Sequence, residues 1–271
     1  MGSEIQDRVF RKGSRTYFTS SLFFPRLVRQ RVAALYAFVR VADNFVDASP
    51  QDRRGFEAFR SLYRRASGGE RTGNPVVDEF VQLMAEASLE PAWVDAFFRA
   101  MEADFTIREY DRLEDTLAYV YGSAEVIGLS MARILGLPAA SHPYARLLGR
   151  SMQYINFIRD LEEDRGLGRR YLPLEGTGLH RLEPDLAVRD PRGLERFVRH
   201  HLALYRGWQR EAEKGFEMIP RRFRIPIKTA SDMYNWTARR IERRPELVFR
   251  RPVKPGRSRI VLRALSNALA G

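Results

Sequence analysis

The 271-residue sequence contains no cysteine, which excludes disulfide bonds, thiolate metal ligands and a cysteine nucleophile. It also lacks an apolar run of about 18 residues, the length that a transmembrane helix needs, because Arg, Asp or Pro interrupts every shorter run. The first fifteen residues carry acids and no apolar core, unlike a secretory signal peptide. We therefore expect a cytoplasmic protein with one domain over residues 1–271.

Lysine is scarce: four of the 46 basic residues are Lys, and the other 42 are Arg. With 34 acidic residues, the formal net charge is +12. Because the guanidinium group matches carboxylate and phosphate geometry, this charge indicates an anionic partner, such as nucleic acid, an anionic membrane surface or a phosphorylated small molecule. An excess of Arg over Lys also arises from genome composition or heat adaptation, so charge alone does not choose among these partners.

Apolar periodicity predicts helices along nearly the whole chain. Pro25 suits the first turn of a helix over 26–47. Further helices are predicted near 52–66, 75–87, 91–107, 114–135, 140–165, 192–217, 221–243 and 258–269. No run alternates apolar and polar residues over the length of a strand, so we expect an all-α fold.

Two segments have weaker or less specific patterns. Residues 172–192 are rich in Gly and Pro and form either a lid or a long surface connection. Ten basic residues lie between Arg239 and Arg263, against Glu242 and Glu246. This basic tail is either a solvated face or a patch for anionic phospholipid headgroups, which predicts peripheral contact with a membrane.

Paired acids occur on two of the predicted helices. Asp43 and Asp47 are four residues apart, so both carboxylates lie on one face, where they repel each other. One interpretation is an ion pair with Arg40 in the same helix. The same spacing returns at Asp160 and Asp164, which we expect on one face of a single helix. The alternative for this second pair is a charged helix end that faces solvent.

Two acid-bearing helices that face a cavity suit Mg²⁺, which prefers oxygen ligands and shares carboxylates with substrate phosphates. The four histidines lack the spacing of a zinc site. The sequence also has no P-loop and no Gly-rich phosphate loop after a strand, which disfavours ATP-driven chemistry.

These motifs resemble those of the squalene/phytoene synthase family, in the family's order from Gly13 to about Tyr234. The segments that carry the resemblance are SRTYF (14–18), LFFP (22–25), YAFVRVADNFVD (36–47), YVYGSAEVIG (119–128) and QYINFIRDLEEDRGLGRRYLP (153–173). The resemblance implies an isoprenoid-synthase-type helical bundle around a central apolar cavity. Three positions depart from the family pattern, and none of them removes an expected metal ligand: Gly13, Asn44 and Glu125.

The resemblance also implies roles for individual residues. The implied ligands of Mg²⁺, with Mn²⁺ as an alternative, are Asp43, Asp47, Asn156, Asp160 and Asp164. The implied contacts to the diphosphate substrates are Ser14, Arg15, Arg40, Gln153, Asn156, Arg159 and Arg169. The implied tyrosines near the reacting centre are Tyr119, Tyr171 and Tyr234. Together with the four aspartates, these tyrosines form the expected catalytic set.

Members of this family condense two allylic diphosphates head to head through a cyclopropylcarbinyl diphosphate. We expect two geranylgeranyl diphosphates to give phytoene without a redox cofactor. The alternative is a squalene or dehydrosqualene synthase that uses farnesyl diphosphate, and NADPH is needed only where squalene is the product.

Three other functions compete with this interpretation. A head-to-tail prenyl diphosphate synthase would carry adjacent acids in a DDxxD motif, which Asp43-Asn44 lacks. A non-catalytic helical assembly factor of the same fold would have no reason to keep a repulsive acidic cluster. Nucleic-acid binding is not expected, since no helix-turn-helix, zinc finger or aromatic RNA platform is present.

Overall fold

The computed structural model describes residues 15–250 and 253–269. Within those ranges the chain is helical, and its one β-type contact is an isolated bridge between Glu109 and Arg170. The all-α prediction is therefore confirmed. No helix within the same ranges is both long enough and apolar enough to cross a membrane.

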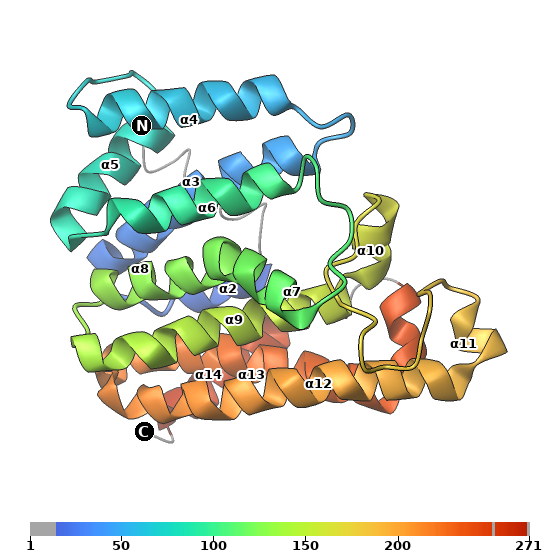
Figure 1. The fold of residues 1–271 in the computed structure, drawn as a ribbon. Coiled ribbons are helices and arrows are strands. Elements are labelled where there is room, and N and C mark those ends of the chain that lie inside the picture. Colours follow the sequence, from blue (N-terminus) through green and yellow to red (C-terminus); the bar gives the residue numbers. More distant parts are fainter. Residues whose placement is uncertain (1–14, 251–252, 270–271) are drawn as a thin grey trace.

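The helices pack around a central long helix, α9, as Figure 1 shows. In chain order, the α-helices are α2 (Arg15–Ser21), α3 (Arg26–Asp47), α4 (Arg53–Ser67), α5 (Pro75–Ala87), α6 (Pro91–Ala103), α7 (Leu113–Val120), α8 (Val126–Ile134), α9 (His142–Arg159), α10 (Leu161–Gly166), α11 (Leu186–Arg189), α12 (Pro191–Lys214), α13 (Arg221–Arg243) and α14 (Arg257–Leu269). A π-helical turn, Tyr121–Glu125, joins α7 to α8.

Two of the predicted helices end earlier than expected. The helix predicted over 140–165 stops at Arg159, because Asp160 leaves helical geometry with φ −98° and ψ 17°, and α10 begins at the next residue. Asp160 and Asp164 therefore do not share one face of a continuous helix, and that prediction is wrong. The helix predicted over 91–107 ends at Ala103, where a turn begins.

Aromatic packing fixes the position of α3. Phe38 is 1% exposed and stacks on Phe80 of α5, with ring centroids 3.8 Å apart. It also meets Phe59 and Tyr63 of α4 and Phe98 of α6 at centroid distances of 5.1–5.7 Å. Such aromatic pairs add about 0.5–1.5 kcal/mol each beyond the burial of their surface. The helix that carries the first acidic pair is thus held rigidly from one side.

An apolar cavity of about 290 Å³ lies on the other side of α3. It is enclosed by α2, α3, α8, α9 and the first half of α13. Two glycines let α8 and α9 approach closely along its wall: a Cβ on Gly128 would lie 2.2 Å from the Ala145 carbonyl oxygen, and one on Gly149 would lie 2.4 Å from that of Ala124. Both α3 and α9 line the cavity, and Asn156 near the C-terminal end of α9 belongs to its wall.

The segment after Tyr171 packs onto the bundle. Leu172 and Leu182 are buried, and the carbonyl of Pro173 accepts a hydrogen bond from Nε2 of His201, 3.1 Å away. Burial lowers the pKa of His201 to about 3, so its ring is neutral and Nδ1 accepts from the hydroxyl of Tyr154. The start of the segment is therefore fixed to α12 and α9.

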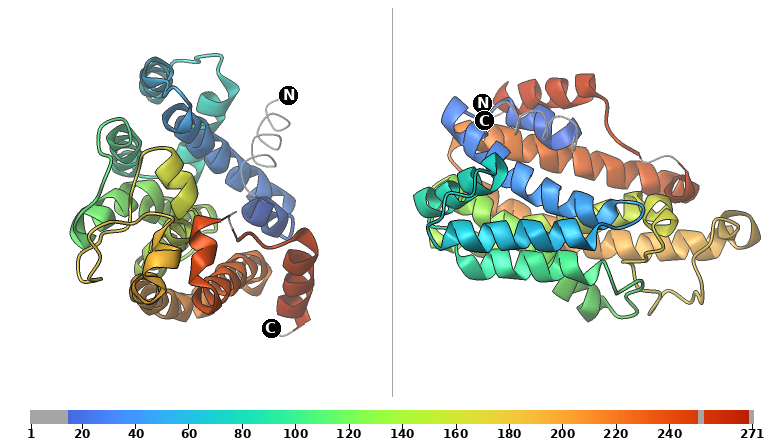
Figure 2. Two further views of the ribbon diagram at one scale, coloured as in Figure 1. Left: turned by 90° about the vertical axis from the view of Figure 1, so that its right-hand side faces the viewer. Right: turned by 90° about the horizontal axis from the view of Figure 1, so that it is seen from above.

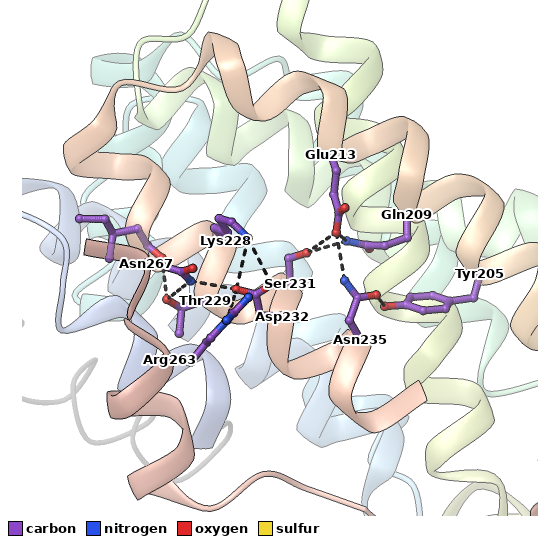
Figure 3. Close-up of polar contacts among 11 residues, drawn as sticks. Tyr205, Gln209, Glu213, Lys228, Thr229, Ser231, Asp232, Asn235, Arg263 and Asn267 are labelled. Carbon is purple, nitrogen blue, oxygen red and sulfur yellow. Dashed lines mark hydrogen bonds and ion pairs between the residues drawn. The ribbon is translucent and has the colours of Figure 1, made fainter. Parts of the chain in front are cut away.

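A polar network connects α9, α12 and α13, and Figure 3 shows its members on α12 and α13. Oε1 of Glu213 accepts hydrogen bonds from Gln209, Ser231 and Asn235 at 2.8–3.1 Å. Gln209 in turn accepts from the hydroxyl of Ser151 on α9, at 2.7 Å. Because buried polar groups are costly when unpaired, this network specifies the register of the three helices.

A second cluster holds α14 against α13, and Figure 2 shows α14 lying beside α13 and α2. Asp232 accepts hydrogen bonds from Nε of Arg263 at 2.7 Å and from Nδ2 of Asn267 at 2.9 Å, and Nζ of Lys228 lies 3.3 Å away (Figure 3). Nδ2 of Asn267 also lies 3.2 Å from the hydroxyl of Thr229. Burial alone would raise the pKa of Asp232, but these cationic and amide donors lower it below its usual value.

We predict that Asp232→Ala lowers the free energy of unfolding at pH 7 by about 1–3 kcal/mol, because Arg263 and Lys228 lose a shared acceptor. Since the pKa of Asp232 is lower in the folded state, its contribution is present at neutral pH and is lost as the pH falls below about 4. Urea titrations of the wild type and the variant, at pH 7 and below pH 4, measure the loss in the free energy of unfolding. An equal loss under the two conditions contradicts the role assigned to the Asp232 carboxylate.

Candidate active site

The first acidic pair lies at the C-terminal end of α3. Nη1 of Arg40 lies 2.6 Å from Oδ2 of Asp43, so the expected intrahelical ion pair is present. Burial and the nearby charge of Asp47 nevertheless raise the pKa of Asp43 to about 7. The repulsion between the two carboxylates therefore outweighs what one arginine supplies.

The second pair lies where α9 gives way to α10. Arg159 donates two hydrogen bonds to the carboxylate of Asp160. Burial and the charges of Asp160 and then Asp47 raise the pKa of Asp164 well above its usual value. Since Asp47 belongs to α3, the two acidic motifs are electrostatically coupled, as acids of two helices facing one site must be. The alternative of a solvent-facing helix end does not describe Asp164, which is half-buried.

Arg169 joins the two motifs. Its Nη1 donates to Oδ1 of Asp47 at 2.8 Å, and its Nη2 donates to the carbonyl of Val46 at the end of α3. The side chain reaches this place because Gly168, with φ +70°, reverses the chain and the Arg169 amide bonds the carbonyl of Asp164 at 2.9 Å. Arg169 is 6% exposed, so it supplies a fixed positive charge between the acids.

A buried carboxylate that the sequence motifs did not reveal lies near Arg169 and Asp47. Asp104, 1% exposed, accepts hydrogen bonds from the hydroxyls of Tyr119 at 2.8 Å and Tyr171 at 2.7 Å. Burial raises its pKa to about 6, although Arg169 and the two tyrosines act in the opposite direction. The sequence signal was available: Asp104 continues the apolar stripe of Phe97 and Met101 at helical spacing, where a charge is unusual.

The predicted tyrosines lie in two places. Tyr119 and Tyr171 contact each other with ring centroids 5.0 Å apart, and Phe157 stacks on Tyr171 at 4.4 Å. Phe157 is buried and belongs to this aromatic cluster. Tyr234 comes from α13 and is close enough to Tyr36, on the cavity wall, to affect its pKa.

Asn156 and Gln153 line the acidic end of the cavity. Oδ1 of Asn156 is buried and has no hydrogen-bond partner within the described part of the chain. A buried acceptor without a donor is costly, so this oxygen suits a ligand that supplies positive charge or a hydrogen-bond donor.

The donor set fits Mg²⁺, although the side chains do not form a ready metal cage. Among residues 15–250 and 253–269, no three His, Asp or Glu side chains gather closely enough to hold an ion by themselves. Ion pairs explain this arrangement, because Asp43, Asp47 and Asp160 each contact an arginine. A divalent cation would bind the hard oxygen donors, reduce the repulsion among the acids and pair with the unsatisfied oxygen of Asn156.

Three further positions complete the comparison with the sequence predictions. Ser14 lies outside the described residues, and Arg15 begins α2, where the backbone alone is described. Glu125, which departs from the family pattern, is fully buried and accepts hydrogen bonds from Arg146 at 2.9 Å and Arg150 at 2.7 Å. Its charge is therefore neutralised between the π turn and α9.

We predict that the stability of Asp104→Asn depends on pH less steeply than that of the wild type. Because the folded pKa of Asp104 is about 6 and lies above its unfolded value, the wild type loses stability as the pH rises from 4 to 7. The variant should avoid about 2 kcal/mol of that loss. Denaturant titrations measure this, with Glu102→Gln as a control at a half-exposed acid near the end of α6. Parallel pH profiles for wild type and Asp104→Asn would refute it.

Comparison with known proteins places this geometry in a family. The model of the squalene/phytoene synthase family matches residues 10–259. The 15-cis-phytoene synthase of Pantoea ananas is 29% identical over 248 residues, which cover 85% of this chain and 79% of the relative. A phytoene synthase of Thermus thermophilus is 31% identical over 187 residues, 65% of this chain and 61% of the relative.

Solved structures show the same fold. A dehydrosqualene synthase in complex with a ligand superposes with a TM-score of 0.85 at 19% identity, covering 99% of this chain and 96% of that one. A squalene synthase from Alicyclobacillus acidocaldarius superposes with a TM-score of 0.79 at 24% identity, covering 89% and 93%.

Proposed function

Because this chain belongs to the squalene/phytoene synthase family, we propose that it condenses two molecules of geranylgeranyl diphosphate head to head to form phytoene. The names of its relatives support phytoene as the product. The observation that carries the proposal is the meeting of two acidic motifs and Arg169 at one end of an apolar cavity. That arrangement suits a substrate with a diphosphate head and a hydrocarbon tail.

The arginines bind the diphosphates in this proposal. Arg40, Arg159 and Arg169 each hold an aspartate in the described structure, so their guanidinium groups already point into the acidic end. Arg pairs with phosphate oxygens through parallel hydrogen bonds, which orients the head group as well as attracting it. Ser14 and Arg15 are proposed to add contacts from the start of the chain, and Gln153 from the cavity wall.

Mg²⁺, or Mn²⁺ in its place, is the proposed cofactor. The residues that would hold it are Asp43, Asp47, Asn156, Asp160 and Asp164. When bound, the ion acts as a Lewis acid that stabilises the diphosphate as it leaves.

The cavity and its aromatic residues protect the carbocations of the reaction. Loss of one diphosphate leaves an allylic cation, and the double bond of the second substrate attacks it to give a cyclopropylcarbinyl diphosphate with release of a proton. Loss of the second diphosphate and rearrangement join the two C1 carbons, and a further proton loss gives phytoene. Apolar walls exclude water, and the faces of Tyr119, Tyr171 and Tyr234 stabilise cations by about 0.5–2 kcal/mol each.

An anionic membrane is the second proposed partner. Phytoene is a forty-carbon hydrocarbon with negligible solubility in water, so it has to pass to a lipid phase after release. The net charge of +12 favours contact with anionic lipid, which attracts each nearby Arg or Lys by about 1 kcal/mol.

We predict that purified protein with Mg²⁺ converts geranylgeranyl diphosphate to a forty-carbon triene without NADPH, as mass spectrometry and absorbance will show. A thirty-carbon product from farnesyl diphosphate would instead identify dehydrosqualene synthase, or squalene synthase where NADPH adds two hydrogens. Elongation with isopentenyl diphosphate would identify a head-to-tail enzyme, and no condensation by folded protein would favour the assembly factor.

We predict that Asp160→Ala abolishes turnover while the helical circular dichroism is retained, because removing one of several repelling acids does not disrupt the apo fold. Glu162→Ala is the matched control: this acid lies two residues away, pairs with Arg165 and faces away from the site. Retained turnover in Asp160→Ala, or unfolding of that variant, contradicts the assigned role.

We predict that Mg²⁺ raises the melting temperature more at pH 8 than at pH 6. The folded pKa of Asp43 is about 7, above its unfolded value, so the metal-free protein loses stability as the pH rises through 7 and the acids become available to a cation. Differential scanning fluorimetry with Mg²⁺ or EDTA measures the shift. Asp43→Asn should reduce it and Glu57→Gln, at an exposed position of α4, should not. The same shift in wild type and Asp43→Asn would count against the metal site.

A further inference from the structure

The outer face of α14 is apolar and open to solvent. Val261, Leu262, Leu265 and Leu269 recur at helical spacing and are 39%, 67%, 51% and 88% exposed. The opposite face, with Ile260 and others, is buried against the bundle. Single exposed leucines are ordinary, but four on one helical face are the mark of a surface that contacts something else.

The position of α14 fixes this face outward. Arg263 and the buried Asn267 both bond Asp232 of α13 (Figure 3). Next to Asn267, Nη2 of Arg221 donates to the carbonyl of Ala268 at 3.0 Å. The C-terminal half of α14 is therefore held in place by three contacts to α13.

Two further exposed apolar residues lie next to the elements that α14 contacts. α14 packs against α2 and α13, as the two views of Figure 2 show. Leu22, directly after α2, is 48% exposed, and Met218, three residues before Arg221, is 36% exposed. We call the four apolar residues of α14 with Leu22 and Met218 the α14 face.

The charge around the α14 face is positive. The sequence has no acid after Glu246 but six basic residues, and it has no acid between Asp7 and Asp43. Arg257 and Arg259 on α14 are both exposed. Glu217, beside Met218, is the nearby exception. An apolar face bordered by arginines complements an anionic bilayer, which offers phosphate groups above an acyl layer.

The α14 face also adjoins the cavity, at the end away from the aspartates. Ser21 and Ile219 line the cavity, and each is the chain neighbour of an exposed member of the face, Leu22 or Met218. Asn156 lines the opposite, acidic end. The apolar interior and the apolar exterior therefore meet at one end of the molecule.

We propose that the α14 face lies on an anionic phospholipid bilayer and that the hydrocarbon product leaves the cavity at this end, directly into the acyl layer. The docking rests on the exposed residues and their charge, whereas the release of product rests on the proposed function. The arginines contact lipid phosphates, and the leucines enter the layer beneath them. No lipid anchor or membrane-spanning helix is needed for this mode of contact.

Vesicle sedimentation of the full chain tests the docking. We expect wild-type protein to bind vesicles of phosphatidylcholine with about 30% phosphatidylglycerol, and to bind pure phosphatidylcholine more weakly. Leu262→Glu with Leu265→Glu should lower the partition coefficient about tenfold or more. The matched control is Val188→Glu, which alters an 85% exposed apolar residue of α11, remote from α14 in Figure 1.

A second variant keeps the test independent of the apolar change. Arg257→Gln with Arg259→Gln should weaken binding at low salt and reduce its dependence on salt, because fewer phosphate contacts remain. Binding of the leucine variant that equals that of wild type overturns the proposal. The proposal is also overturned if the wild-type protein does not bind vesicles. It is overturned as well if the wild-type protein forms dimers and the leucine substitutions abolish the dimers but not vesicle binding, because a second copy of the chain then covers the face.

Measuring turnover in detergent and with vesicles distinguishes a failure of the docking proposal from a failure of the proposed function. The leucine variant should condense geranylgeranyl diphosphate at the wild-type rate in detergent, whereas vesicles should stimulate the wild type alone. Vesicle binding without condensation of any prenyl diphosphate would refute the proposed function and leave the docking intact. Condensation with equal vesicle stimulation of both proteins would refute the route of release.

Discussion

The candidate site depends on how the four carboxylates of the two acidic motifs are held near one another. Asp43 and Asp47 lie at the C-terminal end of α3, where the helix dipole already disfavours negative charge, and Asp160 and Asp164 approach from the end of α9. Arg169 offsets this by bonding both Asp47 and a terminal carbonyl of α3. The raised pKa values of Asp43 and Asp164 show that the arginines compensate incompletely.

Many of the helices and both acidic motifs were predictable from the sequence, because they depend on local spacing. Apolar periodicity predicted most of the helices, although not α2 or α11, and the i,i+4 acids indicated the two motifs with Arg40 beside the first. What could not be predicted depends on contacts between distant segments. The break at Asp160 and the turn that returns Arg169 to α3 belong to the packed structure.

Asp104 shows this limit most clearly. Its place on an apolar stripe was visible, but its function as acceptor for Tyr119 and Tyr171 requires α7 and the irregular segment after α10 to meet it. The same holds for the cavity, since its walls come from five helices and its two ends differ in character. One end is lined by Gln153 and Asn156, close to the acidic motifs, and the other adjoins the exposed α14 face. A polar head and a long hydrocarbon tail would each find a matching environment.

The central claim is that the two substrates are joined through their first carbons. Geranylgeranyl diphosphate labelled with ¹³C at C1 tests this most directly when it is incubated with the protein and Mg²⁺. We predict a product whose ¹³C NMR spectrum shows one-bond coupling between the two labelled carbons. A product in which the label neighbours an unlabelled carbon on both sides, as head-to-tail joining gives, would contradict it.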